Sequence, residues 1–292
     1  MDVKTRIMID KITEYVRKEY KIIGPISDIE SIVVSMGGII VEKTAIDDLS
    51  DIWIRKSGKE SFEIFLPPVQ ISWTIERRNF MIAHELGHSM HSYYSNKEQN
   101  VINADYTIMV AEVASTVNEI LLSDYQIKTE KDNKKKAELI YELLEMIRAT
   151  FFRQAMFAEF EKIVHEKIEN SVMLSADDLN DIYYKLNQKY FGNDIVIDEQ
   201  IKYEWARIPH FYSDFYVYQY ATGYAAASAF ANSILNGEKD AVEKYIGFLK
   251  SGGSDYPIEI LKKAGVDMTT SKPLESTINR FNELLDMLEK EI

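Results

Sequence analysis

His84, Glu85 and His88 form an H-E-x-x-H pattern inside an apolar stretch that is compatible with an α-helix. On a helix, residues four apart differ by roughly 40° in direction and about 6 Å in height, so both imidazoles can bind one metal ion. Glu85 would stand beside the ion, where it can take a proton from the metal-bound water and pass it to a departing amine. The pattern therefore predicts a centre with one zinc ion that hydrolyses peptide bonds. The alternative is a buried amphipathic helix that carries two histidines by chance.

A third metal ligand must come from another part of the chain. His91 shares the helical face, but it stands about 10.5 Å along the axis from His84, too far to share an ion. It also occupies the position where a metzincin needs a glycine. A carboxylate remains, and Glu112 is favoured because its small neighbours would let its helix approach closely. Glu119, seven residues further on the same face, is either a hydrogen-bond partner of a ligand histidine or an ordinary surface carboxylate.

Tyr212, Tyr216 and Tyr220 are spaced by four, and on one helix they would form a stripe of hydroxyls with His210 at its start. Such a stripe could donate hydrogen bonds to the oxyanion of a tetrahedral intermediate. From spacing alone, however, an aromatic core stripe whose hydroxyls reach the surface is the favoured interpretation.

Composition excludes several classes of protein. The 292 residues include 34 Lys and Arg against 47 Asp and Glu, and the net charge of −13 disfavours a nucleic-acid partner. The absence of cysteine removes disulfides and thiolate ligands of zinc. The charged first residues do not begin a signal sequence, and no apolar run is long enough to span a bilayer. We therefore expect a cytoplasmic protein that does not bind membranes, and a homo-oligomer remains open.

The elements that would position these residues are mostly helices. Two helices are expected before residue 37, and three short strands of an antiparallel β-meander are expected at 38–44, 51–56 and 61–66. The helix of the H-E-x-x-H pattern is expected at about 75–95. Further helices are expected at 106–123, 134–169, 175–191 (begun by a capping box at Ser175), 213–236, 238–250, 256–264 and 273–290.

From about residue 83 to the end, about seven tenths of the chain, the sequence resembles the oligoendopeptidase F family of thimet-oligopeptidase-like zinc peptidases. The matching stretches are HELGHSMHSYYS at 84–95, DYTIMVAEVASTVNEILL at 105–122, FRQAMFAEFEKIVHE at 152–166, RIPHFYSDFYVYQYATG at 207–223 and SGGSDYPIEILKKAGVDM at 251–268. Several independent motifs therefore occur in the order expected for that family.

This resemblance implies roles for individual residues. His84, His88 and Glu112 become the zinc ligands, and Glu85 becomes the catalytic carboxylate. His210 becomes a donor to the transition state, together with Tyr216 or Tyr220, whereas Tyr212 is left to substrate binding. The resemblance thus reverses the interpretation that spacing alone favours for the tyrosine stripe.

The front of the chain, from Gly37 to His88, instead resembles the ImmA/IrrE-type metallopeptidases, regulatory proteases that act on repressors. We therefore expect two domains, an N-terminal one with helices and a small sheet (1–78) and a helical zinc-peptidase domain (79–292). The front is far shorter than the N-terminal half of oligoendopeptidases. A substrate site open at one side is expected, unless a second subunit supplies the missing wall.

Together these features predict an α+β fold, mostly α, with a small sheet packed on the H-E-x-x-H helix, and a zinc metalloendopeptidase that cleaves oligopeptides or unfolded segments. The strand from Ser61 to Leu66 is expected to offer a free edge to which an extended peptide substrate adds. One alternative is a regulatory protease that cuts a single protein such as a repressor. The other is a non-catalytic binding protein in which zinc only holds helices together, and the intact Glu85 argues against it because a structural site needs no base.

Overall fold

The computed structural model describes residues 38–42, 53–56, 62–66 and 75–291. Most of the predicted first domain (1–78) lies outside the described residues. This part includes Ser61 and the two helices expected before residue 37. None of the helices in the described ranges combines the length and the apolar character needed to cross a membrane.

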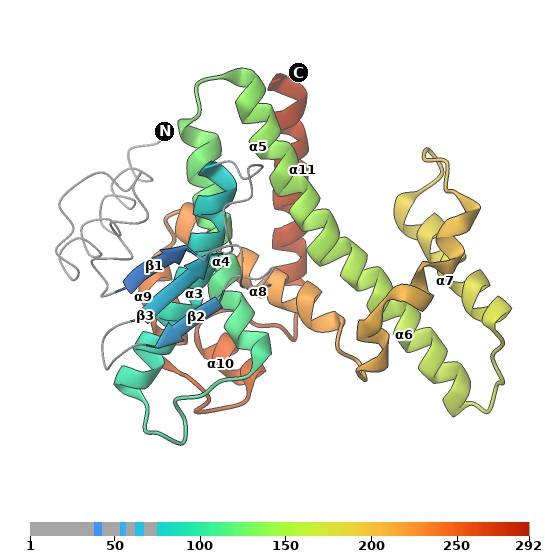
Figure 1. The fold of residues 1–292 in the computed structure, drawn as a ribbon, viewed down its shortest axis with the longest axis horizontal. Coiled ribbons are helices and arrows are strands. Elements are labelled where there is room, and N and C mark those ends of the chain that lie inside the picture. Colours follow the sequence, from blue (N-terminus) through green and yellow to red (C-terminus); the bar gives the residue numbers. More distant parts are fainter. Residues whose placement is uncertain (1–37, 43–52, 57–61, 67–74, 292) are drawn as a thin grey trace.

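A small sheet of three described strands lies beside the helices (Figure 1). The strands are β1 (Gly38–Glu42), β2 (Trp53–Lys56) and β3 (Phe62–Leu66). Their spatial order is β1-β3-β2, with β3 parallel to β1 and antiparallel to β2. The predicted antiparallel meander is therefore wrong, because a meander would keep the strands in chain order. The sheet does pack on the helix that carries the H-E-x-x-H pattern, as predicted, because β2 and β3 both contact this helix.

The order of the strands also overturns the prediction that Ser61 to Leu66 forms a free edge. Leu66 pairs with Glu42 of β1, and Phe65 pairs with Trp53 of β2. Because β3 has a neighbour on each side, it has no free edge for an added peptide strand. Within the described strands, the outer edges belong to β1 and β2.

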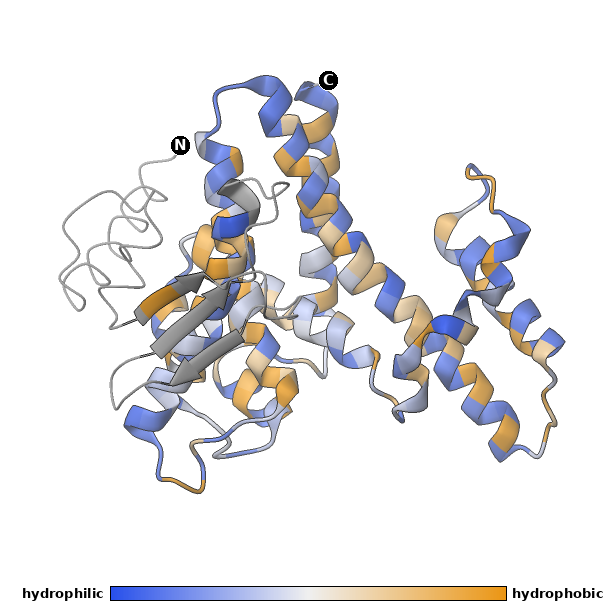
Figure 2. Cartoon of the chain, in the orientation of Figure 1, coloured by the Kyte–Doolittle hydropathy of each residue, from blue (hydrophilic) through white to orange (hydrophobic). Residues whose placement is uncertain are grey.

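The helices divide into a body and an arm (Figure 1). The body consists of α3 (Ile75–Glu98), α4 (Ile108–Thr129), α5 (Asn133–Ile147), α8 (Tyr218–Leu235), α9 (Ala241–Lys250), α10 (Pro257–Lys263) and α11 (Lys272–Glu291). In its centre α3 packs against α4 and α9, and α4 packs against α8. Small buried residues such as Ala114, Ala225 and Ala226 let these helices approach closely. Figure 2 shows hydrophilic residues gathered at the outer ends of α5 and α11.

The arm leaves the body along one long rod. This rod is formed by α5, the π-helical segment η1 (Arg148–Phe152) and α6 (Arg153–Glu169). The single helix predicted over 134–169 is therefore interrupted by a π-helical segment, a feature that comes from one extra residue in a turn. We use the term arm for residues 153–217, which comprise α6, α7 (Ala176–Phe191), η2 (Glu199–Arg207) and η3 (Pro209–Tyr212) with the turn that follows. The predicted capping box at Ser175 is confirmed, because its side chain accepts a hydrogen bond from Asp178 N and the Asp178 carboxylate accepts one from Ser175 N.

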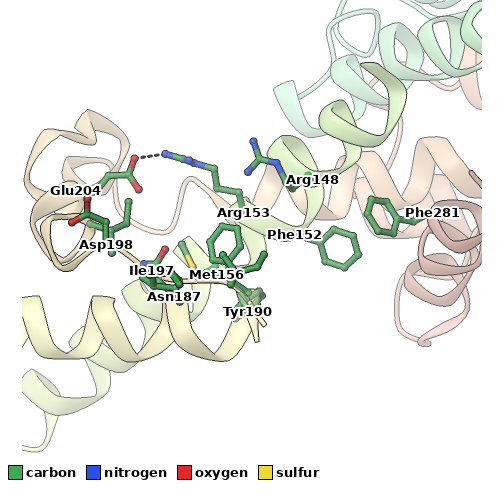
Figure 3. Close-up of a pocket in the computed structure, with 14 residues that line it drawn as sticks. Arg148, Phe152, Arg153, Met156, Asn187, Tyr190, Ile197, Asp198, Glu204 and Phe281 are labelled. Carbon is green, nitrogen blue, oxygen red and sulfur yellow. Dashed lines mark hydrogen bonds and ion pairs between the residues drawn. The ribbon is translucent and has the colours of Figure 1, made fainter. Parts of the chain in front are cut away.

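The arm has an apolar cluster of its own, separate from the core of the body. Its buried members are Met156, Phe157, Phe160, Tyr183, Leu186, Ile208 and Val217. At the base of the arm lies a cavity of about 480 Å³ (Figure 3). One of its walls contains the ion pair between Arg153 Nη2 and Glu204 Oε1 at 2.5 Å, which joins α6 to η2. Glu204 also accepts a hydrogen bond from the Tyr183 hydroxyl of α7 at 2.7 Å, so three elements of the arm meet at one buried carboxylate.

Candidate metal centre

Three potential ligand atoms converge where α3 meets α4. The Nε2 atoms of His84 and His88 are 3.1 Å apart, and Glu112 Oε2 lies 3.9 Å and 3.8 Å from them. Within the part of the chain that the structure describes, this is the only group of three or more such side chains placed to share an ion. The structure therefore brings together the three residues that the sequence analysis selected.

The donor atoms fit a zinc ion. Nitrogen and oxygen ligands at about 2.0 to 2.2 Å in a tetrahedron lie about 3.4 Å from one another, and the three observed separations bracket this value. The Glu112 side chain is 40% exposed, whereas the two histidine side chains are mostly covered. One side of the cluster is thus open for water and substrate, as in catalytic rather than structural zinc sites.

The helices reach this distance because of Gly87, which lies between the two histidines on α3. A Cβ atom at this position would stand 2.5 Å from both Ala114 O and Ser115 Cα of α4. Only glycine fits such a contact between two backbones. The small residues around Glu112 were part of the prediction, but Gly87 was not, although a glycine inside the helix of the H-E-x-x-H pattern was the available signal. Asn118 Nδ2 adds a hydrogen bond to Ala83 O at 3.1 Å across the same interface.

Glu119 lies behind His84. Its Oε1 is 2.7 Å from His84 Nδ1, and its side chain is largely covered. With the proton on Nδ1 and donated to Glu119, the Nε2 lone pair of His84 faces His88 and Glu112, as metal binding requires. Burial opposes the charged form of His84, but the hydrogen bond and charge of Glu119, together with the charges of Glu112 and Glu85, raise its pKa above the usual value.

The carboxylates beside the two histidines have distinct surroundings. Ser115 Oγ donates a hydrogen bond to Glu112 Oε2 at 3.0 Å, which orients this carboxylate. Glu85 is buried, and burial raises its pKa, with the Glu112 charge acting in the same direction and the charge of His84 opposing it. A carboxylate whose pKa is raised toward neutrality is better suited to accept and return a proton.

His88 and His91 lie one helical turn apart, but only His88 is placed to bind a metal ion. Burial and the charge of His84 lower the pKa of His88, so its neutral form, which can bind metal, is favoured. His91 is 1% exposed and stacks on Tyr106 with ring centroids 3.7 Å apart. Burial and the charge of His88 lower the pKa of His91 to about 3, which makes it a neutral core residue. The helical rise predicted that His91 is not a ligand, and its buried position against Tyr106 agrees with this prediction.

The tyrosine stripe does not form one helix. The segment η3 ends at Tyr212 and α8 begins only at Tyr218, so the helix predicted from residue 213 is wrong over its first five positions. The backbone of Phe215 has φ of +46°, which interrupts a right-handed helix. Tyr212 is 87% exposed, and the tyrosines of the stripe whose rings contact His210 are Tyr216 and Tyr220.

The turn nevertheless brings the other members of the group together. Tyr220 Oη is 3.4 Å from His210 Nε2, and the rings of His210 and Tyr216 stack with centroids 5.6 Å apart. Burial, a hydrogen bond with Tyr216 and the nearby charge of Glu112 raise the pKa of Tyr220 to about 12. Tyr220 therefore keeps its proton at neutral pH and lies within electrostatic reach of Glu112.

Comparison with known proteins shows the family to which the chain belongs. The sequence from residue 76 to residue 280 matches the model of Peptidase family M3. The chain belongs to this family. It is 49% identical over 225 residues to Oligopeptidase PepF of Bacillus subtilis, covering 77% of this chain and 34% of that protein. It is 48% identical over 215 residues to an oligoendopeptidase F homolog of Borreliella burgdorferi, covering 73% and 36%.

Solved structures give the same result. The crystal structure of oligoendopeptidase-F from Enterococcus faecium matches with a TM-score of 0.67 at 46% identity, over 73% of this chain and 39% of that one. The structure of a Chlamydophila abortus protein matches with a TM-score of 0.82 at 37% identity, over 96% and 47%. The chain thus spans about a third of the length of the curated relatives and less than half of these structures. The M3 match begins at residue 76, and the ImmA/IrrE-type resemblance of the front stays a prediction.

Proposed function

We propose that this chain carries the catalytic centre of a zinc metalloendopeptidase that hydrolyses oligopeptides or unfolded segments, with one zinc ion held by His84, His88 and Glu112. The observation that carries the proposal is the convergence of these three donors on a partly open site, with Glu119 hydrogen-bonded to the far nitrogen of His84. Peptidases of family M3 are zinc-dependent, which agrees with this donor set.

The bound zinc ion would supply a water molecule of lowered pKa and would polarise the carbonyl of the scissile bond. Glu85, on the same helix as both histidines, accepts the proton of the attacking water and then donates it to the departing amine. As the carbonyl becomes tetrahedral, negative charge develops on its oxygen. His210, Tyr216 and Tyr220 are the residues that would donate hydrogen bonds to this oxygen.

Substrate contacts outside the reacting bond are also proposed. Tyr212 is exposed at the end of η3, next to His210, and we assign it a contact with the bound peptide beyond the scissile bond. If the peptide adds to the sheet as a strand, it pairs with the outer edge of β2, whose strand contacts α3. The alternative of a regulatory protease rests on the front of the chain alone and is not proposed. The alternative of a purely structural zinc site fits poorly with the open side of the cluster and with Glu85.

The test compares the parent protein with Glu85→Gln. Both proteins are expected to contain about one zinc ion per chain, because the change leaves the ligands untouched. Only the parent should cleave a mixture of quenched fluorescent peptides, and a chelator should abolish that cleavage. Hydrolysis by Glu85→Gln within about tenfold of the parent would disprove the assigned role, since removal of a general base costs about 10²-fold or more.

A further inference from the structure

The segment from Ile208 to Val217, which carries His210 and Tyr216, is attached to α6 of the arm. Ile208 and Val217 mark its two ends, and both are buried in the apolar cluster of the arm. Between them, Phe211 packs on α6 with ring centroids 5.5 Å from Phe157 and 5.2 Å from Phe160. His210 and Tyr216 are therefore held by the arm, whereas Tyr220 stands on α8 and the proposed zinc ligands stand on α3 and α4.

The turn just before Tyr216 has an unfavourable backbone conformation. Phe215 has φ of +46°, where the Cβ atom of a bulky residue crowds the neighbouring carbonyl. A residue stays in this region only when its surroundings hold it there. Tyr216 follows directly, and its N–H donates to Ser213 O at 3.1 Å.

Glu161 of α6 stabilises this turn. Its Oε1 accepts a hydrogen bond from Phe215 N–H at 2.9 Å, and the residue is only 4% exposed. One helical turn further along α6, the His165 ring contacts the Phe215 ring with centroids 4.5 Å apart. Carboxylates are rarely buried to this degree unless they bind a partner, and the hydrogen-bond partner of Oε1 is the N–H of the strained turn. Burial raises the pKa of Glu161, against the effect of the donated N–H.

We propose that Glu161 is a positioning residue that acts through Phe215 to place Tyr216 against His210 and Tyr220, and so sets where the donors to the oxyanion stand. The rings of Tyr216 and Tyr220 are 5.6 Å apart, and His210 stacks on Tyr216 at the same separation. A shift of the turn would move Tyr216 and so change both contacts together. The donor role of these residues rests on the proposed function, whereas the effect of Glu161 on the turn rests on the observed hydrogen bond.

The kinetic test uses three variants of the zinc-loaded protein. Glu161→Leu removes the acceptor with little change in volume, and Glu161→Gln keeps an acceptor oxygen for Phe215 N–H. The control is Glu159→Leu, two residues away on α6, where the lost carboxylate bonds Lys189 and Tyr190 of α7 rather than the turn. Misplaced donors act in the transition state, so Glu161→Leu should lower kcat by about tenfold or more with KM changed less than about twofold. Glu161→Gln should restore most of kcat, and the control should match the parent.

A second measurement does not depend on activity. Amide hydrogen exchange followed by NMR should show Phe215 N–H protected in the parent, and this protection should be lost in Glu161→Leu. The amide of Tyr220, which donates to Val217 O at 3.2 Å, should be unchanged. Exchange of Phe215 N–H in the parent at the rate of a free amide would overturn the proposal, even if Glu161→Leu failed to fold.

Two further variants separate the possible failures. If His210→Ala and Tyr216→Phe both keep the parent kcat, the donor role in the proposed function fails, whatever the exchange data show for the turn. If these two variants lose kcat while Glu161→Leu loses the protection of Phe215 but keeps kcat, the positioning role of Glu161 is overturned and the donor role stands.

Discussion

Glu112 and Glu119 lie seven residues apart on α4, yet they meet different nitrogen atoms of the same imidazole. Glu112 faces Nε2 of His84 at 3.9 Å, whereas Glu119 lies 2.7 Å from Nδ1. In zinc sites, a carboxylate on the far nitrogen fixes the tautomer and ring orientation of the ligand, and the carboxylate on the near side completes the donor set. On the proposed assignment, the two residues contribute unequally to metal affinity.

We expect Glu112→Ala to weaken zinc binding much more than Glu119→Ala. Loss of a hydrogen-bond partner behind a ligand typically lowers affinity by about 10-fold to 100-fold, and loss of one of three protein ligands should exceed this range. Competition with a fluorescent chelator measures both affinities, and Glu85→Gln serves as the control that keeps all ligands. Equal losses in the two alanine variants would mean that the ligand assignment is wrong.

Sequence spacing predicted the grouping of some site residues better than that of others. The grouping of His84, His88 and Glu112 followed from a helical interval of four and from the small residues around Glu112, which are local features. The group of His210, Tyr216 and Tyr220 was expected only from family resemblance. Spacing placed it on one helix, because a positive φ at Phe215 leaves no mark in the sequence. The hydrogen bond from Phe215 N–H to Glu161 was also missed, because Glu161 and Phe215 are 54 positions apart in the sequence.

At the scale of elements, the contact between α3 and α4 sets the geometry of the metal cluster. Backbone meets backbone at Gly87, so the two helices have no side chain between them that could adapt to a change. The position of Glu112 relative to the two histidines is therefore a direct result of this contact.

We expect Gly87→Ala to force α3 and α4 apart, because the added Cβ would stand 2.5 Å from the α4 backbone. Overpacking of this kind costs about 1 to 3 kcal/mol of unfolding free energy, and the displaced ligands should also bind zinc more weakly. Gly247→Ala in α9 is the matched control, because nothing lies within 4 Å of its added Cβ. Urea unfolding and zinc titration of both variants test this, and equal behaviour of the two would contradict it.

The positions of helices and strands were predicted better than the order of the strands, for a physical reason. The apolar period of a helix is visible within the segment itself, so the ends of α3, α7, α10 and α11 lie close to their expected positions. The order of a sheet depends instead on how distant segments pair, and β3 is placed between β1 and β2 without a local signal. The π-helical segment η1 was missed because one extra residue in a turn leaves the apolar pattern nearly intact.

At the scale of the whole molecule, the proposed site draws on two apolar clusters. The proposed zinc ligands stand on helices of the body, and His210 and Tyr216 stand on a segment buried at both ends in the arm. The arm in turn depends on Glu204, which bonds Tyr183, Arg153 and Arg207. This carboxylate links α6, α7 and η2 ahead of the His210 segment.

We expect the stability contributed by Glu204 to depend on pH. Burial opposes its charge, but the hydrogen bonds from Tyr183 and Arg153 and the charges of Arg153 and Arg207 lower its pKa below the usual value. A lowered pKa in the folded state means that the contribution is complete above the unfolded pKa of about 4.3 and is lost as pH falls through the folded pKa. Glu204→Gln should cost about 2 kcal/mol at pH 7, and the gap to the parent should narrow below pH 5. Urea unfolding across this range tests it, with exposed Glu169→Gln as the charge control, and a gap independent of pH would contradict it.

The separate cluster of the arm has a consequence for heat inactivation. The arm has far fewer buried residues than the body, so it should lose its order at a lower temperature. His210 and Tyr216 would then be displaced, while α3 and α4 would still hold the ion. Peptide cleavage should therefore disappear several degrees before zinc is released to a dye, and brief cooling from that interval should restore activity without added metal. Simultaneous loss of both signals would show that arm and body melt as one unit.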